Sequence, residues 1–322
     1  MARETVYILD PIHPAGVERL RAAHDVIMPE QGPMQDGNDP RLADTTFIVI
    51  RTTELPQALI ARMPQLKAIV KHGAGVDNIP IPFATSRGVM VCNTPGGNNS
   101  TAVAEGAVTL MLAVLRRVRE MDAVVRENCW DERWKTRLGD LTDAKVGLIG
   151  FGRIARCTAK ICGAGFGATI AAHDPMLSPD EIAAAGAAPM DLPELLAWAD
   201  VISIHVPLTE GTRGLIGAKE LAGMQAGAVI VNTSRGGIID EAALADALRE
   251  GRIGGAGIDV FEAEPPPADH PLFALDNVVL SPHVAGVTEA SMKHMALHCA
   301  EVVETIVSGE RPATLLNPEV LA

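Results

Sequence analysis

The sequence has little positive charge, few cysteines and no long apolar run. Its formal net charge of −13 argues against nucleic acid or an anionic membrane surface as a partner. Its five cysteines are odd in number and form no paired CxxC pattern, so neither a disulfide framework nor a structural zinc site is expected. The N-terminus lacks the apolar core of a signal peptide, and the apolar run at residues 107–115 stops at two arginines, too short to span a bilayer. We therefore expect a soluble, cytoplasmic protein without a bound metal.

The chain is nevertheless rich in apolar residues, with 48% hydrophobic content over 322 residues, enough for two domains with separate cores. In the first hundred residues, short apolar runs alternate with helical patterns, which predicts a parallel sheet covered on both faces. The predicted strands are Val6–Leu9, Val26–Met28, Phe47–Ile50, Ala68–Val70 and Val89–Val91. The predicted helices between them are Pro14–Ala23, Pro56–Met63 and Pro82–Ser86.

A stretch rich in glycine and asparagine, NTPGGNNS, precedes a long apolar pattern. Ser100 and Thr101 are candidate helix caps and Glu105 is an acid suited to a first turn, so we expect one helix from Ser100 to about Glu127. The stretch before this helix is a candidate hinge between domains. Trp130 and Trp134 follow in an irregular charged segment, where packing beneath a loop and a role in an interface are both open.

The segment from Lys145 to Asp174 reads as the first half of a dinucleotide-binding unit. An apolar strand at Val146–Ile149 leads into a glycine turn and then into a helix that begins at Arg153. In such a unit the first glycine allows the tight turn, the second lets the backbone approach a pyrophosphate, and the helix N-terminus attracts the negative charge. The third fingerprint position is Ala155, a tolerated variant. The candidate cofactor contacts here are Gly150, Phe151, Gly152, Arg153 and Ile154.

Asp174 ends the next predicted strand, Thr169–His173, where an acid would bind the adenosine ribose hydroxyls. Its charge would repel a 2'-phosphate and no arginine follows closely, so NAD is favoured over NADP. The alternative is a structural glycine turn without a ligand. The strand before the turn, the helix after it and the acid at the second strand end together favour the dinucleotide.

Further apolar strands follow at Val201–Ile204, Val229–Val231, Gly257–Val260 and Val278–Leu280, which completes the six of a full dinucleotide fold. Residues able to do chemistry come directly after these strands. Because the carboxyl ends of parallel strands share one crevice, we expect them to form a single site. They are His205, Pro207, Asn232, Thr233, Ser234, Arg235, Asp259, Glu262, Glu264, Pro282 and His283.

The loop KHGAGVDNI, residues 71–79, follows a strand end directly and carries two glycines. Its backbone N–H groups can form an anion-binding nest for a carboxylate, and a plain strand-to-helix loop is the open alternative. The C-terminal segment has a helical pattern at Thr288–Ser308 and is expected to return to the N-terminal domain. We therefore expect a discontinuous substrate domain, residues 1–99 and 288–322, an inserted NAD-binding domain, residues 100–287, and a cleft between them.

The chain resembles the D-isomer-specific 2-hydroxyacid dehydrogenases over nearly its whole length. The matching stretches are KHGAGVDNI, NTPGGN, VGLIGFGRIA, AAHDP, HVPLTEGTRGLI, VNTSRGGIIDE, GIDVFEAEP and SPHVAG, in the family's order. The resemblance implies reversible hydride transfer between NAD(H) and a 2-hydroxy or 2-keto acid. It also implies a Rossmann domain inserted into a flavodoxin-like domain, both doubly wound α/β, and a homodimer built on the NAD-binding domains.

The resemblance also implies individual roles: Arg235 binds the substrate carboxylate, Glu264 is the acid beside a histidine, and His283 is the acid/base. These residue types suit the chemistry, because reduction of a ketone needs a proton donor and arginine binds a carboxylate through two hydrogen bonds. Substrate contacts are implied at Ala74, Gly75, Val76 and Arg235. The implied cofactor contacts beyond the glycine turn and Asp174 are His205, Pro207, Thr212, Thr233, Ser234, Arg235, Asp259, His283 and Gly286.

The GAGVDN loop looks most like the phosphoglycerate dehydrogenase branch, and we do not expect the C-terminal regulatory domain that some phosphoglycerate dehydrogenases carry. Four basic residues could meet a second anionic group, such as the phosphate of 3-phosphoglycerate, or could be ordinary solvated charges: Arg51, Lys71, Arg133 and Lys135. Glyoxylate or hydroxypyruvate reduction is an alternative activity. An NAD-sensing, corepressor-like binding protein is an alternative of another class. Formate or phosphite oxidation would need substrate-loop residues that the sequence does not reveal.

Overall fold

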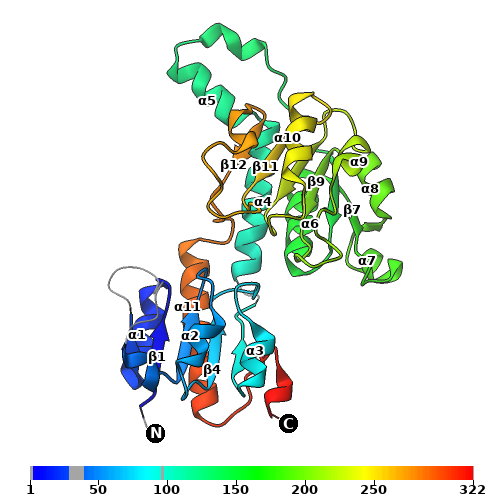
Figure 1. The fold of residues 1–322 in the computed structure, drawn as a ribbon. Coiled ribbons are helices and arrows are strands. Elements are labelled where there is room, and N and C mark those ends of the chain that lie inside the picture. Colours follow the sequence, from blue (N-terminus) through cyan, green and yellow to red (C-terminus); the bar gives the residue numbers. More distant parts are fainter. Residues whose placement is uncertain (1–2, 29–39, 96–97, 322) are drawn as a thin grey trace. The chain divides into compact units, whose positions relative to one another are not determined.

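The computed structural model describes residues 3–28, 40–95 and 98–321. The chain divides into two compact units, the first made of Met1–Asn99 with Val287–Ala322 and the second of Ser100–Gly286. Each unit has its own parallel sheet with helices on both faces (Figure 1). Gly96 and Gly97 of the NTPGGN motif, at the centre of the expected hinge, lie outside the described residues.

The first unit contains a five-stranded parallel sheet in the order β2-β1-β3-β4-β5. This is the flavodoxin-like order, so that prediction is confirmed. The central strand β3 reads Phe-Ile-Val-Ile with all four residues buried, as expected for a strand covered on both faces. The strands are β1 (Thr5–Ile8), β2 (Asp25–Ile27), β3 (Phe47–Ile50), β4 (Ala68–Lys71) and β5 (Met90–Cys92).

Helices α1 and α11 pack over one face of this sheet and helices α2 and α3 over the other. Thr288 caps α11 through its side chain, which accepts the N–H of Ser291, so the C-terminal helix begins where the sequence predicted. Asn317 then ties the last segment to the sheet, because its side chain accepts the Val91 N–H. The helices are α1 (Pro14–Ala23), η1 (Pro40–Asp44), α2 (Gln57–Ala61), α3 (Ile81–Ser86), α11 (Glu289–Val307) and η4 (Pro318–Leu321).

The second unit contains a seven-stranded parallel sheet in the order β12-β11-β10-β9-β6-β7-β8. Chain order reverses on either side of β6, as in a Rossmann fold, and the switch point lies between β6 and β9. The prediction of six strands missed β8, because an edge strand of two residues leaves no apolar run. The strands are β6 (Lys145–Ile149), β7 (Thr169–His173), β8 (Ala188–Pro189), β9 (Val201–Ile204), β10 (Val229–Asn232), β11 (Gly255–Ile258) and β12 (Val278–Leu280).

Helices cover both faces of this second sheet as well. One face packs against α4, α6 and α7, and the other packs against α8, α9 and α10. Among the residues that the structure describes, no helix is long and apolar enough to cross a membrane. The helices are α4 (Asn98–Leu115), α5 (Val118–Arg126), η2 (Trp130–Trp134), α6 (Arg153–Phe166), α7 (Pro179–Ala184), α8 (Leu192–Trp198), α9 (Ala218–Ala222), α10 (Glu241–Arg249) and η3 (Pro271–Ala274).

The prediction of one helix from Ser100 to about Glu127 is wrong. Helix α4 begins at Asn98, so Ser100 and Thr101 lie inside it and are not caps, and Glu105 lies beyond its first turn. The helix stops at Leu115 because Arg117 adopts a left-handed conformation, with φ of 49°, and α5 starts in a new direction. In Figure 1, α5 and the segment after it reach away from the seven-stranded sheet.

Candidate active site

The glycine turn lies at the carboxyl end of β6, at the switch point of the sheet. Gly150 has a φ of +85°, and a Cβ built there would stand 2.8 Å from Cγ1 of Val206. Only glycine is compatible with both the conformation and the space. Gly152 precedes α6 without a side-chain cap, and a Cβ there would meet no atom within 4 Å. The first turn of α6 is therefore open to an anionic group.

Asp174 follows β7 and lies beside this turn. One carboxylate oxygen accepts the Phe151 N–H at 2.8 Å, and the other accepts the Met176 N–H at 2.9 Å. The carboxylate thus holds the glycine turn against the end of β7. A carboxylate has about four acceptor sites, so these two bonds leave capacity for ribose hydroxyls.

Polar atoms at the ends of β9 and β10 have no hydrogen-bond partner among the described residues. They are Nε2 of His205 and Oγ1 of Thr233, and both atoms are buried. Burial lowers the pKa of His205 to about 4, so its ring is neutral at physiological pH. Unpaired buried polar groups are uncommon in native proteins and indicate a missing partner. Their place at the carboxyl ends of the strands fits a bound dinucleotide.

Two hydroxyls predicted to touch the cofactor have partners within the protein. Thr212 Oγ1 donates to the Pro207 carbonyl at 2.6 Å, which closes the loop after β9. Ser234 Oγ donates to the Val206 carbonyl, which joins the loops after β9 and β10. Both hydroxyls retain acceptor lone pairs. Thr212 and Ser234 therefore shape the edge of the site as well as being candidate contacts.

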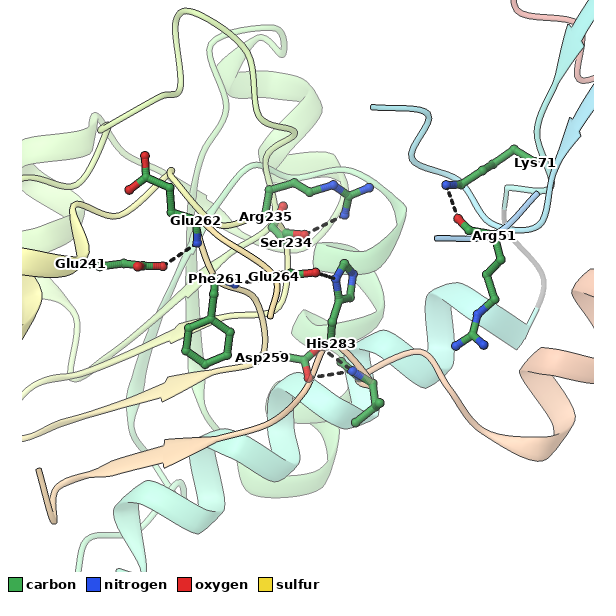
Figure 2. Close-up of polar contacts among 12 residues, drawn as sticks. Arg51, Lys71, Ser234, Arg235, Glu241, Asp259, Phe261, Glu262, Glu264 and His283 are labelled. Carbon is green, nitrogen blue, oxygen red and sulfur yellow. Dashed lines mark hydrogen bonds and ion pairs between the residues drawn. The ribbon is translucent and has the colours of Figure 1, made fainter. Parts of the chain in front are cut away.

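His283 and Glu264 come together although they are 19 positions apart in the chain. Nδ1 of His283 lies 2.7 Å from Oε2 of Glu264 (Figure 2), and Oε1 of Glu264 accepts the Phe261 N–H at 3.1 Å. Burial by itself would raise the pKa of Glu264. Hydrogen bonds from His283 and Phe261, with the positive charges of His283 and Arg235, outweigh burial and hold this pKa below its ordinary value. Glu264 is therefore the ionised partner that orients the imidazole.

A pocket of about 440 Å³ borders this pair. Its walls are mainly apolar, and the His283 and Glu264 side chains at its edge are 43% and 38% exposed, so the pair is accessible from the pocket. Phe261 and Leu280 are among its apolar lining residues. The other lining residues are Glu264, Pro265, Pro266, Phe273, Ser281, Pro282 and His283.

Asp259 shapes the segment that carries His283. Asp259 is 1% exposed, and its carboxylate accepts the N–H groups of Val284 and Ala285, each at 2.9 Å. Its carbonyl accepts the His283 N–H at 2.7 Å. His283 has a left-handed backbone, with φ of 55°, a conformation that is uncommon outside glycine. The three hydrogen bonds hold this conformation in place, and Gly286 ends the same segment.

Arg235 follows β10 on a turn that closes on itself. Nδ2 of Asn232 donates to the Arg235 carbonyl at 2.8 Å, and Nη1 of Arg235 donates to the Ser234 carbonyl at 2.7 Å. Figure 2 shows its side chain on the same side of the sheet end as Glu264 and His283. The three predicted catalytic residues thus come from three separate loops at one end of one sheet.

The predicted substrate loop belongs to the first unit. Ala74 is exposed, and Gly75 and Val76 are half-buried. Lys71 is buried, and its ammonium donates to the Arg51 carbonyl and to Oδ1 of Asn78. Lys71 is therefore not an ordinary solvated charge, because it ties the ends of two loops together.

Arg133 and Lys135 lie on the segment after α5 and have local partners. The Arg133 guanidinium lies 5.0 Å from the ring centre of Trp130 and 4.8 Å from that of Trp134. Lys135 pairs with Glu132 at 2.5 Å. The two tryptophans are 59% and 80% exposed, so the interpretation that they pack beneath a loop is wrong. An interface role is the alternative that stays open.

Sequence reasoning passed over three residues that contact the loops of the site: Gly236, Glu241 and His270. Gly236 packs directly against the Phe261 backbone, and Glu241 accepts the Glu262 N–H. The glycine pair of SRGG and the acid of IIDE were present in the quoted motif, but nothing in their spacing reveals these long-range contacts. His270 gave no local signal at all.

Comparison with known proteins adds the identity of the family. The model of the D-isomer specific 2-hydroxyacid dehydrogenase NAD-binding domain matches residues 108–285, more than half of the chain. The chain belongs to this family. It is therefore an oxidoreductase of 2-hydroxy and 2-keto acids that uses a nicotinamide dinucleotide, as the motifs predicted.

Similar proteins with assigned activities include glyoxylate reductases and D-3-phosphoglycerate dehydrogenases. A glyoxylate reductase of Thermofilum pendens is 38% identical over 100% of this chain and 96% of its own length. A D-3-phosphoglycerate dehydrogenase of Archaeoglobus fulgidus is 37% identical over 94% of this chain, which spans 57% of that relative. The dehydrogenase thus extends well beyond the part that this chain matches.

Solved structures of similar fold cover nearly the whole chain. The TT0316 protein of Thermus thermophilus has a TM-score of 0.88 and 31% identity, with 97% of this chain and 99% of that one covered. An NADPH-dependent glyoxylate/hydroxypyruvate reductase of Sinorhizobium meliloti, solved with NADP and malonate, has a TM-score of 0.87 and 29% identity, with coverage of 99% and 98%. The two-domain α/β architecture is thus confirmed.

Proposed function

We propose that this dehydrogenase reduces a small 2-keto acid to the D-2-hydroxy acid with NADH, with His283 as the proton donor. The observation that carries the proposal is the 2.7 Å contact between His283 Nδ1 and Glu264 Oε2. A histidine whose far nitrogen is bound by a carboxylate keeps its other nitrogen available for the reacting oxygen. Residues 1–99 and 288–322 are proposed as the substrate domain and residues 100–287 as the NAD-binding domain.

Bound NADH would supply the hydride, and the chain's own residues would handle the developing charge. Arg235 would hold the substrate carboxylate through its planar fork and draw electron density from the carbonyl. Protonated His283 would deliver a proton from Nε2 as negative charge builds on the oxygen. In the reverse direction neutral His283 would remove the hydroxyl proton. The loop residues Ala74, Gly75 and Val76 would donate backbone N–H groups to the carboxylate.

We propose NAD as the cofactor in preference to NADP. Asp174 supports this choice, because its carboxylate stands beside the glycine turn and would repel a 2'-phosphate. The cofactor contacts proposed are the turn residues 150–154 with Asp174, the β9 and β10 ends, and Asp259, His283 and Gly286. The unpaired atoms of His205 and Thr233 support the contacts at the strand ends.

Two substrate classes are supported by different observations. Glyoxylate reductases among the relatives, and the engagement of Lys71, Arg133 and Lys135 with protein groups, favour a substrate with one carboxylate. Phosphoglycerate dehydrogenases of similar identity favour a substrate with a second anion, which would then depend chiefly on Arg51. The first class needs no additional anion-binding residue, so we propose glyoxylate or hydroxypyruvate.

A substrate screen tests the proposal. Initial rates with NADH and with NADPH would be measured for glyoxylate, hydroxypyruvate, phosphohydroxypyruvate and sulfopyruvate. The highest kcat/KM is expected for glyoxylate or hydroxypyruvate with NADH. A strong preference for phosphohydroxypyruvate or sulfopyruvate that weakens with added salt would instead indicate the second anion site. NAD binding without turnover of any acid would favour the NAD-sensing alternative.

We further propose that the protein is a cytoplasmic homodimer built on the NAD-binding domains. The arm formed by α5 and η2 supports this, because none of its residues is buried and Val125, Trp130 and Trp134 are more than half exposed. Apolar side chains gathered on an exposed arm favour a protein partner. Val125→Asp should yield monomers in analytical ultracentrifugation. Met176→Asp, at a site 87% exposed elsewhere on the same unit, should leave the wild-type mass.

A further inference from the structure

Glu241 and His270 form a largely buried pair next to the loop that carries Glu264. Nε2 of His270 lies 2.9 Å from Oε2 of Glu241, and the two side chains are 6% and 15% exposed. Nδ1 of His270 accepts the Leu272 N–H at 3.4 Å. A ring nitrogen that accepts carries no proton, so Nε2 is the nitrogen that donates to Glu241. The orientation of this pair is therefore defined by the backbone of η3.

The pair holds the turn from Phe261 to Glu264 at two points. Oε1 of Glu241 accepts the Glu262 N–H at 2.7 Å. The Phe261 ring meets the His270 ring edge to face, with centroids 5.5 Å apart and planes at 84°. Figure 2 shows Glu241 bound to the turn from one side and Glu264 leaving it toward His283 on the other. The turn is thus attached to the start of α10 as well as to β11.

Glu241 itself has little freedom to move. It is the first residue of α10, directly after the N-cap Asp240, whose side chain accepts the Ala243 N–H at 3.0 Å. Its carboxylate lies at the positive end of the helix dipole, a position that suits an acidic side chain. With one oxygen bound to a backbone N–H and the other to His270, the carboxylate is a fixed anchor.

We propose that Glu241, held by His270, is a positioning residue that keeps the Glu264 carboxylate on Nδ1 of His283. Without this anchor the Phe261–Glu264 turn would sample other positions, and Glu264 would spend less time bound to the imidazole. The protonated form of the His283 imidazole would then be less stabilised, so as pH rises the proton donor would be lost at a lower pH than in wild type. This inference rests on the proposed roles of Glu264 and His283. Arg235 and Asp259 are charged groups of this unit that lie beside Glu264 and His283.

The test is the pH dependence of kcat/KM for keto-acid reduction in Glu241→Gln. Glutamine keeps an acceptor for the Glu262 N–H but presents an N–H group to the N–H of His270, so the anchor is disrupted. The alkaline limb is the part of the profile in which kcat/KM declines as pH rises. It is expected to move to lower pH, in the same direction as in Glu264→Gln but by a smaller amount. In the double variant Glu241→Gln/Glu264→Gln the limb should stay where Glu264→Gln alone puts it, because the coupled partner is already absent.

A second pair of variants changes His270, the partner of Glu241. His270→Leu removes the donor and should move the limb as Glu241→Gln does. His270→Gln keeps an N–H donor and should restore much of the wild-type profile. Glu220→Gln is the matched control, because Glu220 also lies in the first turn of a short helix and accepts a backbone N–H, from Gly217 at 3.2 Å. It should leave the limb unchanged.

NADH binding by fluorescence and thermal unfolding would confirm that each variant is folded. A uniform loss of activity at every pH, with the limb unmoved, would show that the pair is merely structural and overturn the inference. If Glu264→Gln itself left the limb unmoved, the proposed role of Glu264 would fail instead. The two failures are therefore distinguishable within one series of measurements.

Discussion

Gly236 lies in direct backbone contact with Phe261: a Cβ built on Gly236 would stand 1.9 Å from both the carbonyl carbon and the carbonyl oxygen of Phe261. Gly236 directly follows Arg235, and Phe261 begins the turn that carries Glu264. The spacing between the proposed carboxylate-binding arginine and the acid behind His283 is therefore set by a contact that only glycine permits. A loop shift of a fraction of an ångström here would change the geometry of the whole group.

Gly236→Ala tests this contact. The added methyl group must displace the Phe261 peptide, and misplacement of about 1 Å can cost roughly 100-fold in rate. We expect a loss of kcat/KM of that order while NADH binding persists, measured by steady-state kinetics and fluorescence titration. Gly165→Ala is the control, because a Cβ at Gly165 would meet no atom within 4 Å. Equal activity of both variants would contradict the prediction.

Glu264→Gln removes a carboxylate whose pKa lies below its ordinary value, and which is therefore ionised across the working pH range. Loss of its charge disfavours the imidazolium form of His283. Reduction needs the protonated ring, so as pH rises the activity of the variant should begin to decline at a lower pH than that of wild type. In oxidation, which needs the neutral ring, activity should extend to lower pH. The measurement is kcat/KM against pH in both directions, and limbs that stay or move to higher pH would exclude this role.

Arg235→Lys keeps the positive charge but loses the planar fork that binds a carboxylate through two hydrogen bonds. We expect a loss of about 2 to 4 kcal/mol in transition-state stabilisation, taken from kcat/KM with the best keto acid. Arg249→Lys, on the exposed end of α10 where the arginine pairs with Asp246, should be neutral. Wild-type kinetics for Arg235→Lys would rule out the carboxylate-binding role.

Asp174→Ala should narrow the preference for NADH over NADPH, because the charge that repels a 2'-phosphate is gone. It also removes the acceptor of the Phe151 N–H, so affinity for both cofactors should fall. Asp174→Asn separates the two effects, since its amide oxygen can still accept that N–H. We expect Asn to keep more of the affinity and to lose a similar part of the selectivity. An unchanged ratio of the two kcat/KM values would disprove the role in selectivity.

His72 makes the stability of the first unit depend on pH. Burial, with the charges of Arg51 and Lys71, lowers its pKa to about 4, below the value near 6.5 expected when unfolded. The unfolded state therefore binds more protons between these values, and stability falls as pH drops through this window. At pH 5.5 the loss should be about 1 to 1.5 kcal/mol relative to pH 7.5. His72→Asn should lack this loss. The difference between its free energy of unfolding and that of wild type, measured in urea, should therefore be smaller at pH 5.5 than at pH 7.5.

Much of the fold was determined by the sequence alone, because the signals are local. Continuous apolar runs such as Phe47–Ile50 mark strands buried on both faces, and the alternation with helices requires a parallel sheet. The turn at Gly150 and the acid at Asp174 indicated the dinucleotide unit for the same reason. Motifs in series then predicted the family, which the comparison with known proteins confirmed. The sequence analysis missed two features because they leave only a weak local signal. Strand β8 has only two residues, and the break between α4 and α5 depends on one left-handed arginine.

The tertiary structure decided how the chemistry is assembled. Arg235, Glu264 and His283 follow different strands, and only the register of β10, β11 and β12 places their loops together. The fit of Gly236 against Phe261 and the hydrogen bond from the Glu262 N–H to Glu241 involve backbone groups of residues far apart in the chain, and the Glu241–His270 pair joins side chains 29 positions apart. Side-chain periodicity carries no information about such contacts, because they depend on where the main chain of one loop passes another. The residue types at the site could thus be predicted from the sequence, whereas the contacts that hold their loops in place could be identified only in the tertiary structure.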